Sequence, residues 1–138
     1  RFTLSPVFDA QVVDAAKHYG LLSVPGAATP AEIVAAHRYG ASLVKVFPAG
    51  ALGGPEYLKA LRGPLPSVSL LPTSGPTAEN LAAYFEAGAS AVGVRAEVFA
   101  AGRDEASIKA AALRVRRAVD VARLGARAET RGIPPAHA

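Results

Sequence analysis

Short apolar runs rich in branched side chains alternate along the chain with longer, alanine-rich stretches of helical periodicity. The apolar runs predict five β-strands, at residues 2–5, 21–24, 43–47, 68–71 and 91–94. The stretches between and after them predict helices near residues 9–19, 30–39, 55–61, 78–87 and 104–128. Each strand and its helix occupy roughly 20 to 25 residues, the size of a minimal β/α repeat with short connections.

Capping residues mark the boundaries of several predicted helices. Thr29 precedes Pro30, and Glu32 follows three residues after Thr29, a sequence typical of a capping box with proline in the first turn. Asp9 and Thr77 are the predicted N-caps of two other helices. Three helical stretches are followed by a glycine, as a left-handed C-cap favours: Gly20, Gly40 and Gly88.

Strands that alternate with helices predict an α/β fold with a parallel sheet covered by helices. A doubly wound sheet and part of a (β/α)8 barrel both fit this order. No GxGxxG or GxxxxGK[ST] motif opens a helix, which argues against a doubly wound nucleotide-binding fold. A full barrel typically needs ~200 residues or more, so 138 residues are too few for a complete one. Residues 129–138, which contain Pro134-Pro135, are predicted to be a flexible tail.

Composition narrows the class of protein. Apolar residues make up 51% of the chain and charged residues 19%, which supports a sizeable core and excludes a disordered chain. There is no cysteine, so disulfides, thiolate nucleophiles and sulfur-ligated metals are excluded, and a cytoplasmic location is consistent. His18, His37 and His137 do not cluster, so no metal site and no cofactor are predicted. No apolar run approaches the ~20 residues that cross a bilayer.

The net charge of +4 comes largely from the last third of the chain. The basic residues there are Arg103, Lys109, Arg114, Arg116, Arg117, Arg123, Arg127 and Arg131. Nucleic-acid binding would require aromatic side chains among them or a known motif, and no aromatic residue follows Phe99. The pattern favours a solvated helix face, with no nucleic-acid or membrane partner, and a basic protein also suits an anionic small-molecule substrate.

The lysine inside the predicted strand at 43–47 carries the main chemical signal. Side chains alternate along a strand, so Lys45 shares one face with Leu43 and Phe47 while Val44 and Val46 share the other. If the valines pack under helices, Lys45 lies inside a barrel beside an aromatic ring. Burial favours the neutral amine, which attacks a ketone to form an imine. The alternative, a lysine whose amine reaches solvent or a carboxylate, is equally compatible with the strand pattern.

Several motifs occur in an order that resembles a known enzyme family. They are Phe2-Thr3-Leu4-Ser5-Pro6, Val24-Pro25-Gly26 with Thr29-Pro30, Val44-Lys45-Val46-Phe47-Pro48-Ala49, Gly53-Gly54, Pro72-Thr73-Ser74-Gly75, Gly88-Ala89 and Ala91-Val92-Gly93. Together they resemble the C-terminal two-thirds of the KHG/KDPG aldolases, which act on 4-hydroxy-2-oxoglutarate and 2-keto-3-deoxy-6-phosphogluconate. The resemblance implies a TIM (β/α)8 barrel, of which residues 1–128 form a part that covers roughly strands 4–8.

The resemblance also implies roles for individual residues. Lys45 would be the Schiff-base lysine, and Phe47 would pack against the pyruvyl part of the substrate. Thr73 would bind the substrate carboxylate, and Pro25 would belong to the same substrate-binding set. The implied phosphate cradle consists of Ser74, Gly75, Gly93, Val94 and Arg95. The implied reaction is reversible cleavage of 2-keto-3-deoxy-6-phosphogluconate to pyruvate and glyceraldehyde 3-phosphate, in a cytoplasmic homo-oligomer, a trimer by resemblance. Cleavage of 4-hydroxy-2-oxoglutarate to pyruvate and glyoxylate is a second implied reaction.

Three departures from the family pattern leave an alternative open. Ser74 stands where the family usually has glycine. Arg95 replaces a small phosphate-binding serine, and its side chain either binds phosphate through the planar guanidinium or blocks the phosphate site. The family's first three β/α units, with their proton-shuttling glutamate, have no counterpart here. Glu32 and Glu56 do not take the role of that glutamate, because both lie at helix starts, where capping and the helix dipole explain them. The alternative function is an inactive or truncated aldolase relative that acts as a binding or assembly module.

Overall fold

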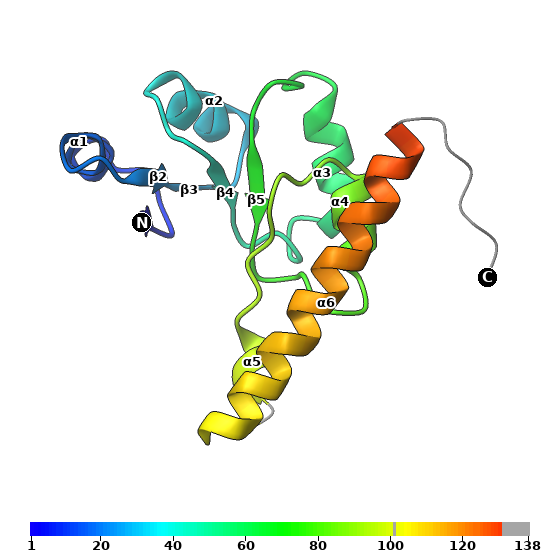
Figure 1. Ribbon diagram of the computed structural model, residues 1–138. Coiled ribbons are helices and arrows are strands. Elements are labelled where there is room, and N and C mark those ends of the chain that lie inside the picture. Colours follow the sequence, from blue (N-terminus) through cyan, green and yellow to red (C-terminus); the bar gives the residue numbers. More distant parts are fainter. Residues whose placement is uncertain (101, 131–138) are drawn as a thin grey trace.

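The structure is a computed structural model, which describes residues 1–100 and 102–130. Its strands are β1 (Phe2–Leu4), β2 (Leu22–Val24), β3 (Gly26–Ala27), β4 (Val44–Val46) and β5 (Leu70–Pro72). Its helices are α1 (Ala10–His18), α2 (Pro30–Arg38), α3 (Gly54–Arg62), α4 (Leu81–Glu86), α5 (Ala96–Ala100) and α6 (Glu105–Thr130). The predicted α/β order is confirmed, and the strands stand at the centre of the molecule with helices around them (Figure 1). Of the predicted tail, residues 131–138 lie outside the described residues.

The strand pairs are all parallel, and each pair joins two strands that follow one another in the chain. β1 pairs with β2, and β3, β4 and β5 form a second sheet in that order. Pro25 separates β2 from β3 because a proline has no N–H to give to the ladder. The carbonyl of Pro25 still accepts the backbone N–H of Lys45, at 2.8 Å. Residues 22–27 therefore form one extended segment that pairs first with β1 and then with β4.

The predicted strand at residues 91–94 is wrong as a regular strand. The segment runs beside β5, since the N–H of Ser90 bonds to the carbonyl of Leu70 and the N–H of Gly93 to that of Pro72, both at 2.9 Å. Only one bridge forms, between Thr73 and Gly93. Within the described part of the chain no further strand pairs with this segment, so no ladder extends it. The short helix α5, which was not predicted, begins at Ala96, three residues after Gly93.

Capping residues were predicted correctly for two helices and wrongly for a third. Asp9 caps α1, and Thr29 and Glu32 form the expected capping box of α2. Gly20, Gly40 and Gly88 have the positive φ angles expected of C-caps. Thr77 is not the N-cap of α4, which begins after Asn80. The N–H of Thr77 bonds to the side chain of Asn80 at 2.7 Å, so residues 77–80 form a separate turn before the helix.

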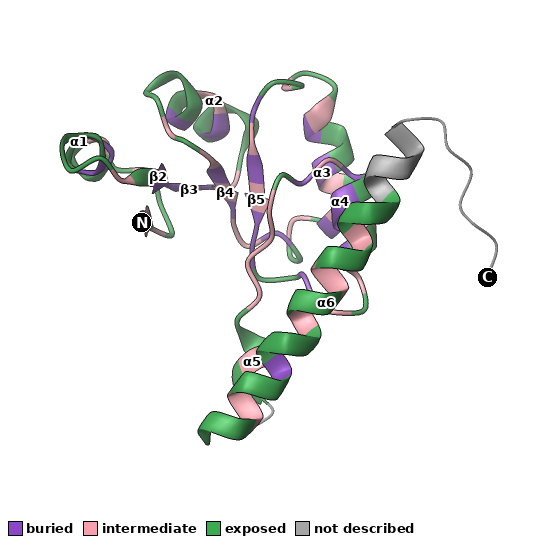
Figure 2. Ribbon diagram, in the orientation of Figure 1, coloured by how far each residue is buried: buried purple, intermediate pink, exposed green. Residues whose placement is uncertain are grey.

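The core lies between one face of β4 and the surrounding helices. Val44 and Val46 are fully buried, as are Ile33 of α2 and Leu58 of α3. Figure 2 shows this buried layer along the strands and the inward faces of the helices. Because neighbouring strand residues face opposite sides, the buried valines place Lys45 on the other face. The alternation predicted for residues 44–46 is confirmed.

The last helix, α6, packs against α4 and α5 and runs along one side of the molecule (Figure 1). The six basic residues from Arg103 to Arg123 in this part of the chain are all exposed, as predicted for a solvated face. Arg116 and Asp120 form an exposed ion pair of 3.0 Å one helical turn apart. Among the helices in residues 1–100 and 102–130, none combines the length and apolar character needed to cross a membrane.

Candidate active site

Lys45 lies at the centre of β4 and is held on both sides by pairing with neighbouring strands. Its backbone is opposite Gly26 of β3 and Leu71 of β5. The side chain is half-buried, and burial lowers the pKa of its amine below the ordinary 10.5. The Nζ atom lies 4.4 Å from the centre of the Phe47 ring. Lys45 is therefore a partly desolvated amine beside an aromatic face.

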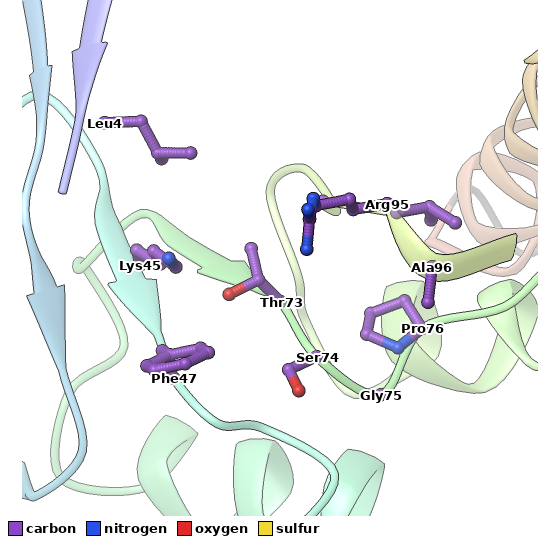
Figure 3. Close-up of a pocket in the computed structure, with 11 residues that line it drawn as sticks. Leu4, Lys45, Phe47, Thr73, Ser74, Gly75, Pro76, Arg95 and Ala96 are labelled. Carbon is purple, nitrogen blue, oxygen red and sulfur yellow. The ribbon is translucent and has the colours of Figure 1, made fainter. Parts of the chain in front are cut away.

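The amine opens into a pocket of about 370 Å³. Its lining residues come from separate parts of the chain: Leu4, Lys45, Phe47, Thr73, Ser74, Gly75, Pro76, Gly93, Val94, Arg95 and Ala96. In Figure 3, Lys45 and Phe47 form one wall, Arg95 and Ala96 the opposite wall, and Thr73 lies between them. Among these described residues two are cationic and none is acidic. The pocket therefore has the charge expected of a site for an anion.

The structure brings together every predicted site residue except Pro25. Pro25 is buried at the junction of β2 and β3 and does not line the pocket. Its contact with the site is the 2.8 Å hydrogen bond that its carbonyl accepts from Lys45. Leu4, Pro76 and Ala96 line the pocket without having been predicted. Leu4 belongs to the motif Phe2–Pro6, and Pro76 and Ala96 directly follow the predicted residues Gly75 and Arg95, so adjacency to predicted residues was the available signal.

Thr73 carries an unpaired polar group at the base of the pocket. The residue is 9% exposed, and its Oγ1 atom is buried without a hydrogen-bond partner among the described residues. A buried hydroxyl without a partner costs about 1–3 kcal/mol. Since Thr73 lines the pocket, a ligand in the pocket is the natural partner for this hydroxyl. Its methyl group faces the bridge, where a Cβ on Gly93 would lie 2.4 Å from the Thr73 Cγ2 atom.

The loop after β4 and the loop after β5 are joined by backbone hydrogen bonds next to the pocket. The N–H of Ala49 bonds to the carbonyl of Thr73 at 2.9 Å, and the N–H of Gly50 to that of Ser74 at 2.7 Å. Ser74 adopts a left-handed conformation with φ 59°, which is uncommon for a residue with a side chain. A Cβ on Gly75 would lie 2.5 Å from the Tyr84 hydroxyl and 2.7 Å from the Gly50 nitrogen. Only glycine fits this close approach of the two loops.

Arg95 occupies the wall opposite Lys45 and is exposed. Figure 3 shows its guanidinium turned toward the side of the pocket where Thr73 lies. No hydrogen bond or ion pair within residues 1–100 and 102–130 engages this guanidinium. An exposed planar fork of this kind suits carboxylate or phosphate oxygens. In the same described residues no three histidine, aspartate or glutamate side chains lie close enough together to hold a metal ion.

Comparison with known proteins decides the family. The family model described as "KDPG and KHG aldolase" matches residues 1–111. The chain belongs to the KDPG and KHG aldolase family. The match includes every residue that lines the pocket, so the site lies within the family domain. The predicted resemblance is confirmed.

Individual aldolases show how far the similarity extends. The chain is 37% identical over 101 residues to the 2-dehydro-3-deoxy-6-phosphogalactonate aldolase of Escherichia coli, covering 72% of this chain and 49% of that protein. A solved structure titled "Native KDPGal structure" superposes with a TM-score of 0.79 at 33% identity over 86% of this chain and 58% of that chain. The KDPG aldolase of Legionella pneumophila, with pyruvate captured as a covalent carbinolamine intermediate, gives a TM-score of 0.64 at 28% identity over 88% of this chain and 58% of that chain. This aldolase-family chain spans about half the length of the curated relatives it matches.

Proposed function

We propose that this chain carries the imine-forming site of a class I, pyruvate-dependent aldolase, with Lys45 as the nucleophile. The observation that carries the proposal is the half-buried amine of Lys45, whose pKa burial lowers and which opens into a pocket that also contains Arg95 and has no carboxylate among its described lining residues. Of the ordinary side-chain nucleophiles, a desolvated lysine amine is the one that condenses with ketones. The Legionella pneumophila relative, which holds pyruvate as a carbinolamine, supports covalent chemistry of this kind.

The chemistry proceeds through a bond from the Lys45 nitrogen to the keto carbon of the substrate. The neutral amine attacks the carbonyl carbon, and the resulting carbinolamine takes up a proton and loses water to give a protonated imine. In the cleavage direction, the substrate hydroxyl loses its proton to water while the imine accepts the electron pair of the breaking carbon–carbon bond, and the aldehyde half departs. The enamine left on Lys45 then takes up a proton, and water hydrolyses the imine to release pyruvate and the free amine. Phe47 keeps water away from this nitrogen, since its ring lies 4.4 Å from Nζ. The Thr73 hydroxyl, buried and unpaired, donates to the carboxylate next to the keto carbon.

The far end of the pocket binds the phosphate of the aldehyde half in this proposal. The cradle consists of Ser74, Gly75, Gly93, Val94 and Arg95. Glycine at positions 75 and 93 lets the neighbouring segments of the protein approach each other closely, because a Cβ at either position would lie within 2.5 Å of another atom. Arg95 supplies the charge, which a phosphate with two negative charges requires. Pro25 contributes through its carbonyl, which fixes the backbone of Lys45.

The substrate proposed on this basis is a 2-keto-3-deoxy-6-phospho sugar acid, with 2-keto-3-deoxy-6-phosphogluconate as the first choice. Its cleavage gives pyruvate and glyceraldehyde 3-phosphate. The named relatives act on the galactonate-derived and gluconate-derived compounds, which supports this class. Cleavage of 4-hydroxy-2-oxoglutarate to pyruvate and glyoxylate is the second proposed reaction.

We also propose that five pieces of this chain correspond to strands 4–8 of a (β/α)8 barrel: β1, the extended segment formed by β2 and β3, β4, β5 and the segment after α4. Neighbouring parallel strands in chain order support this arrangement, as does the overlap with the aldolase structures. By the family resemblance, the working protein is a cytoplasmic homo-oligomer, a trimer.

Trapping of pyruvate tests the imine directly. The protein is incubated with pyruvate and borohydride, and intact and peptide masses locate the adduct. One reduced pyruvyl group on Lys45 is expected, with none in Lys45→Met. Lys59, an exposed lysine of α3, provides the matched control, and Lys59→Met is expected to retain the adduct. Absence of an adduct from the folded, unsubstituted protein contradicts the proposal.

The lining of the pocket favours one second candidate. Among the described lining residues there is no carboxylate, histidine or tyrosine to move a proton between carbon and solvent. A chain with this pocket can bind a keto acid or form an imine without completing turnover, as an inactive relative would. A pyruvyl adduct on Lys45 together with no release of pyruvate from 2-keto-3-deoxy-6-phosphogluconate favours this candidate over the aldolase.

A further inference from the structure

Glu97 connects three separate parts of the structure near the end of the pocket that is proposed to bind phosphate. Its Oε2 atom accepts the backbone N–H of Ala78 at 2.8 Å, in the loop between β5 and α4. Its Oε1 atom accepts from Nη2 of Arg114 on α6, also at 2.8 Å. The Glu97 side chain is only 15% exposed, whereas that of Arg114 is 56% exposed. Glu97 lies in α5 and does not line the pocket.

The two walls that Glu97 joins are those of the proposed phosphate cradle. One wall is the loop that contains Ser74, Gly75 and Pro76, and the other begins at Val94 and continues into α5. The Thr73–Gly93 bridge joins these walls at the end nearest β5. The bond between Ala78 and Glu97 joins them at the other end. The lining residues Ser74 to Pro76 and Val94 to Ala96 lie between these two connections in the sequence.

The loop has its own internal support, which separates folding from positioning. The side-chain nitrogen of Asn80 bonds to the Gly75 carbonyl at 3.0 Å, and the Asn80 Oδ1 atom accepts the N–H of Thr77 at 2.7 Å. The loop therefore keeps its local turn without Glu97. Glu97 instead links the loop to the segment that carries Arg95, which precedes Glu97 by two residues.

We propose that Glu97 is a positioning residue that sets the separation between the Ser74–Pro76 loop and Arg95, and thereby the affinity of the pocket for phosphate. The inference rests on the proposed function for the identity of the anion. The ion pair with Arg114 and the bond from Ala78 lower the pKa of the Glu97 carboxyl, in that order of importance. The carboxylate is therefore charged when the site is in use, and it holds both partners at once.

The experiment compares three variants of the protein. Glu97→Ala removes both connections, and Glu97→Gln keeps an acceptor for Ala78 but loses the ion pair with Arg114. Asp120→Asn is the matched control. It removes an exposed ion pair on α6, the helix that carries Arg114, and Asp120 does not line the pocket. Each protein is titrated with inorganic phosphate at low salt, observed by phosphorus NMR. Pyruvate trapping on Lys45 and the melting temperature are measured in parallel.

The expected result is a selective loss of phosphate affinity. Glu97→Ala should raise the dissociation constant for phosphate by about tenfold, the effect of one hydrogen bond to a charged group. Glu97→Gln should have a smaller effect, and Asp120→Asn none. Pyruvate trapping should stay unchanged in all three, because Lys45 lies on β4 and not on either wall joined by Glu97.

Two results overturn the proposal. One is phosphate affinity in Glu97→Ala equal to that of the unsubstituted protein, which includes the case in which neither binds phosphate. The other is a parallel loss of phosphate binding, pyruvate trapping and melting temperature, which makes Glu97 a residue of general stability. Failure of pyruvate trapping in the unsubstituted protein contradicts the imine proposal alone, since the phosphate titration still decides the role of Glu97.

Discussion

The Nζ atom of Lys45 lies 4.4 Å from the centre of the Phe47 ring, and the two side chains belong to one strand face. This contact has two opposed effects on the amine. The face of the ring attracts a cation, by about 0.5–1 kcal/mol at exposed sites, while the bulk of the ring excludes the water that a charged amine needs. Burial lowers the pKa of Lys45, and the Phe47 ring is one of the groups next to the amine. We therefore expect Phe47 to favour the neutral, nucleophilic form of the amine, which a substitution of the ring can test.

The rate of pyruvate trapping should follow the titration of Lys45. Only the neutral amine attacks, so the rate rises with pH, and the lowered pKa moves the midpoint of that rise below 10.5. Phe47→Ala admits water, raises the pKa of Lys45 toward its ordinary value and slows trapping at neutral pH. The measurement is the initial trapping rate between neutral and alkaline pH for both proteins. A midpoint that falls in Phe47→Ala contradicts the desolvating role of the ring.

Thr73→Val should exchange binding for stability. The Thr73 Oγ1 atom is buried without a partner among the described residues, and valine has almost the same shape without the hydroxyl. Removal of the unpaired group should stabilise the fold by about 1 kcal/mol, or about 4 °C in melting temperature. Pyruvate affinity should fall in the same variant, since the carboxylate loses its donor. Thermal unfolding and trapping at graded pyruvate concentrations measure the two effects, and a less stable Thr73→Val would refute the unpaired-hydroxyl argument.

Gly75→Ala should damage the site through a steric clash. The added methyl would lie 2.5 Å from the Tyr84 hydroxyl and 2.7 Å from the Gly50 nitrogen, so the loops after β4 and β5 must separate. Phosphate affinity should fall at least about tenfold, because one wall of the cradle moves. Gly125→Ala is the control: apart from the adjoining helix backbone, no atom of the described residues lies within 4 Å of the new methyl, and the helix should gain about 0.5–1 kcal/mol. Equal phosphate titrations for Gly75→Ala and Gly125→Ala would exclude the clash as a determinant of binding.

Arg95→Gln should decide between a binding and a blocking arginine. The guanidinium lines the pocket and has no partner in the described part of the chain, so it is available to an anion. Phosphate affinity should fall about tenfold or more in the variant, and the salt dependence of binding should weaken with the loss of one charge. Phosphate titrations at two salt concentrations measure both. Tighter phosphate binding by Arg95→Gln would show that the side chain obstructs the cradle.

Arg62→Met should destabilise the fold without changing the site chemistry. The Arg62 guanidinium donates to the carbonyls of Pro66, Val68 and Gly88, and so joins α3 to the segments on either side of β5 and α4. Methionine keeps the apolar stem and leaves these carbonyls without their donor, at a cost of about 2–3 kcal/mol. Chemical denaturation measures the loss, with Lys59→Met on the exposed side of α3 as control. A loss no larger than that of the control would mean that water replaces Arg62 freely.

Local patterns in the sequence predicted the part of the site that depends on one strand. Alternation around Lys45 placed the valines in the core and the amine opposite them, because side-chain direction in a strand has a fixed period. The caps at Asp9 and Thr29 were also predictable, because each cap involves residues no more than three positions apart in the sequence.

Contacts between distant segments were not predictable in this way. The bond from Ala78 to Glu97 joins residues 19 positions apart, and the approach of Tyr84 to Gly75 depends on how α4 packs. The strand predicted at 91–94 had the right composition, but a regular strand also requires a partner along its length, and among the described residues Thr73 alone bridges to it. The displaced N-cap of α4 has a similar origin, because Asn80 captures the N–H of Thr77.

The pairing of Lys45 with Gly26 on one side and Leu71 on the other leaves its Cα no freedom to travel. The amine then explores only the arc that its own methylene chain allows, a radius of about 6 Å from that anchored point. In the proposed reaction, a keto acid must therefore enter this arc before a bond can form. The strand pairing leaves the approach to be made by the substrate, because the backbone that carries the amine is held on both sides.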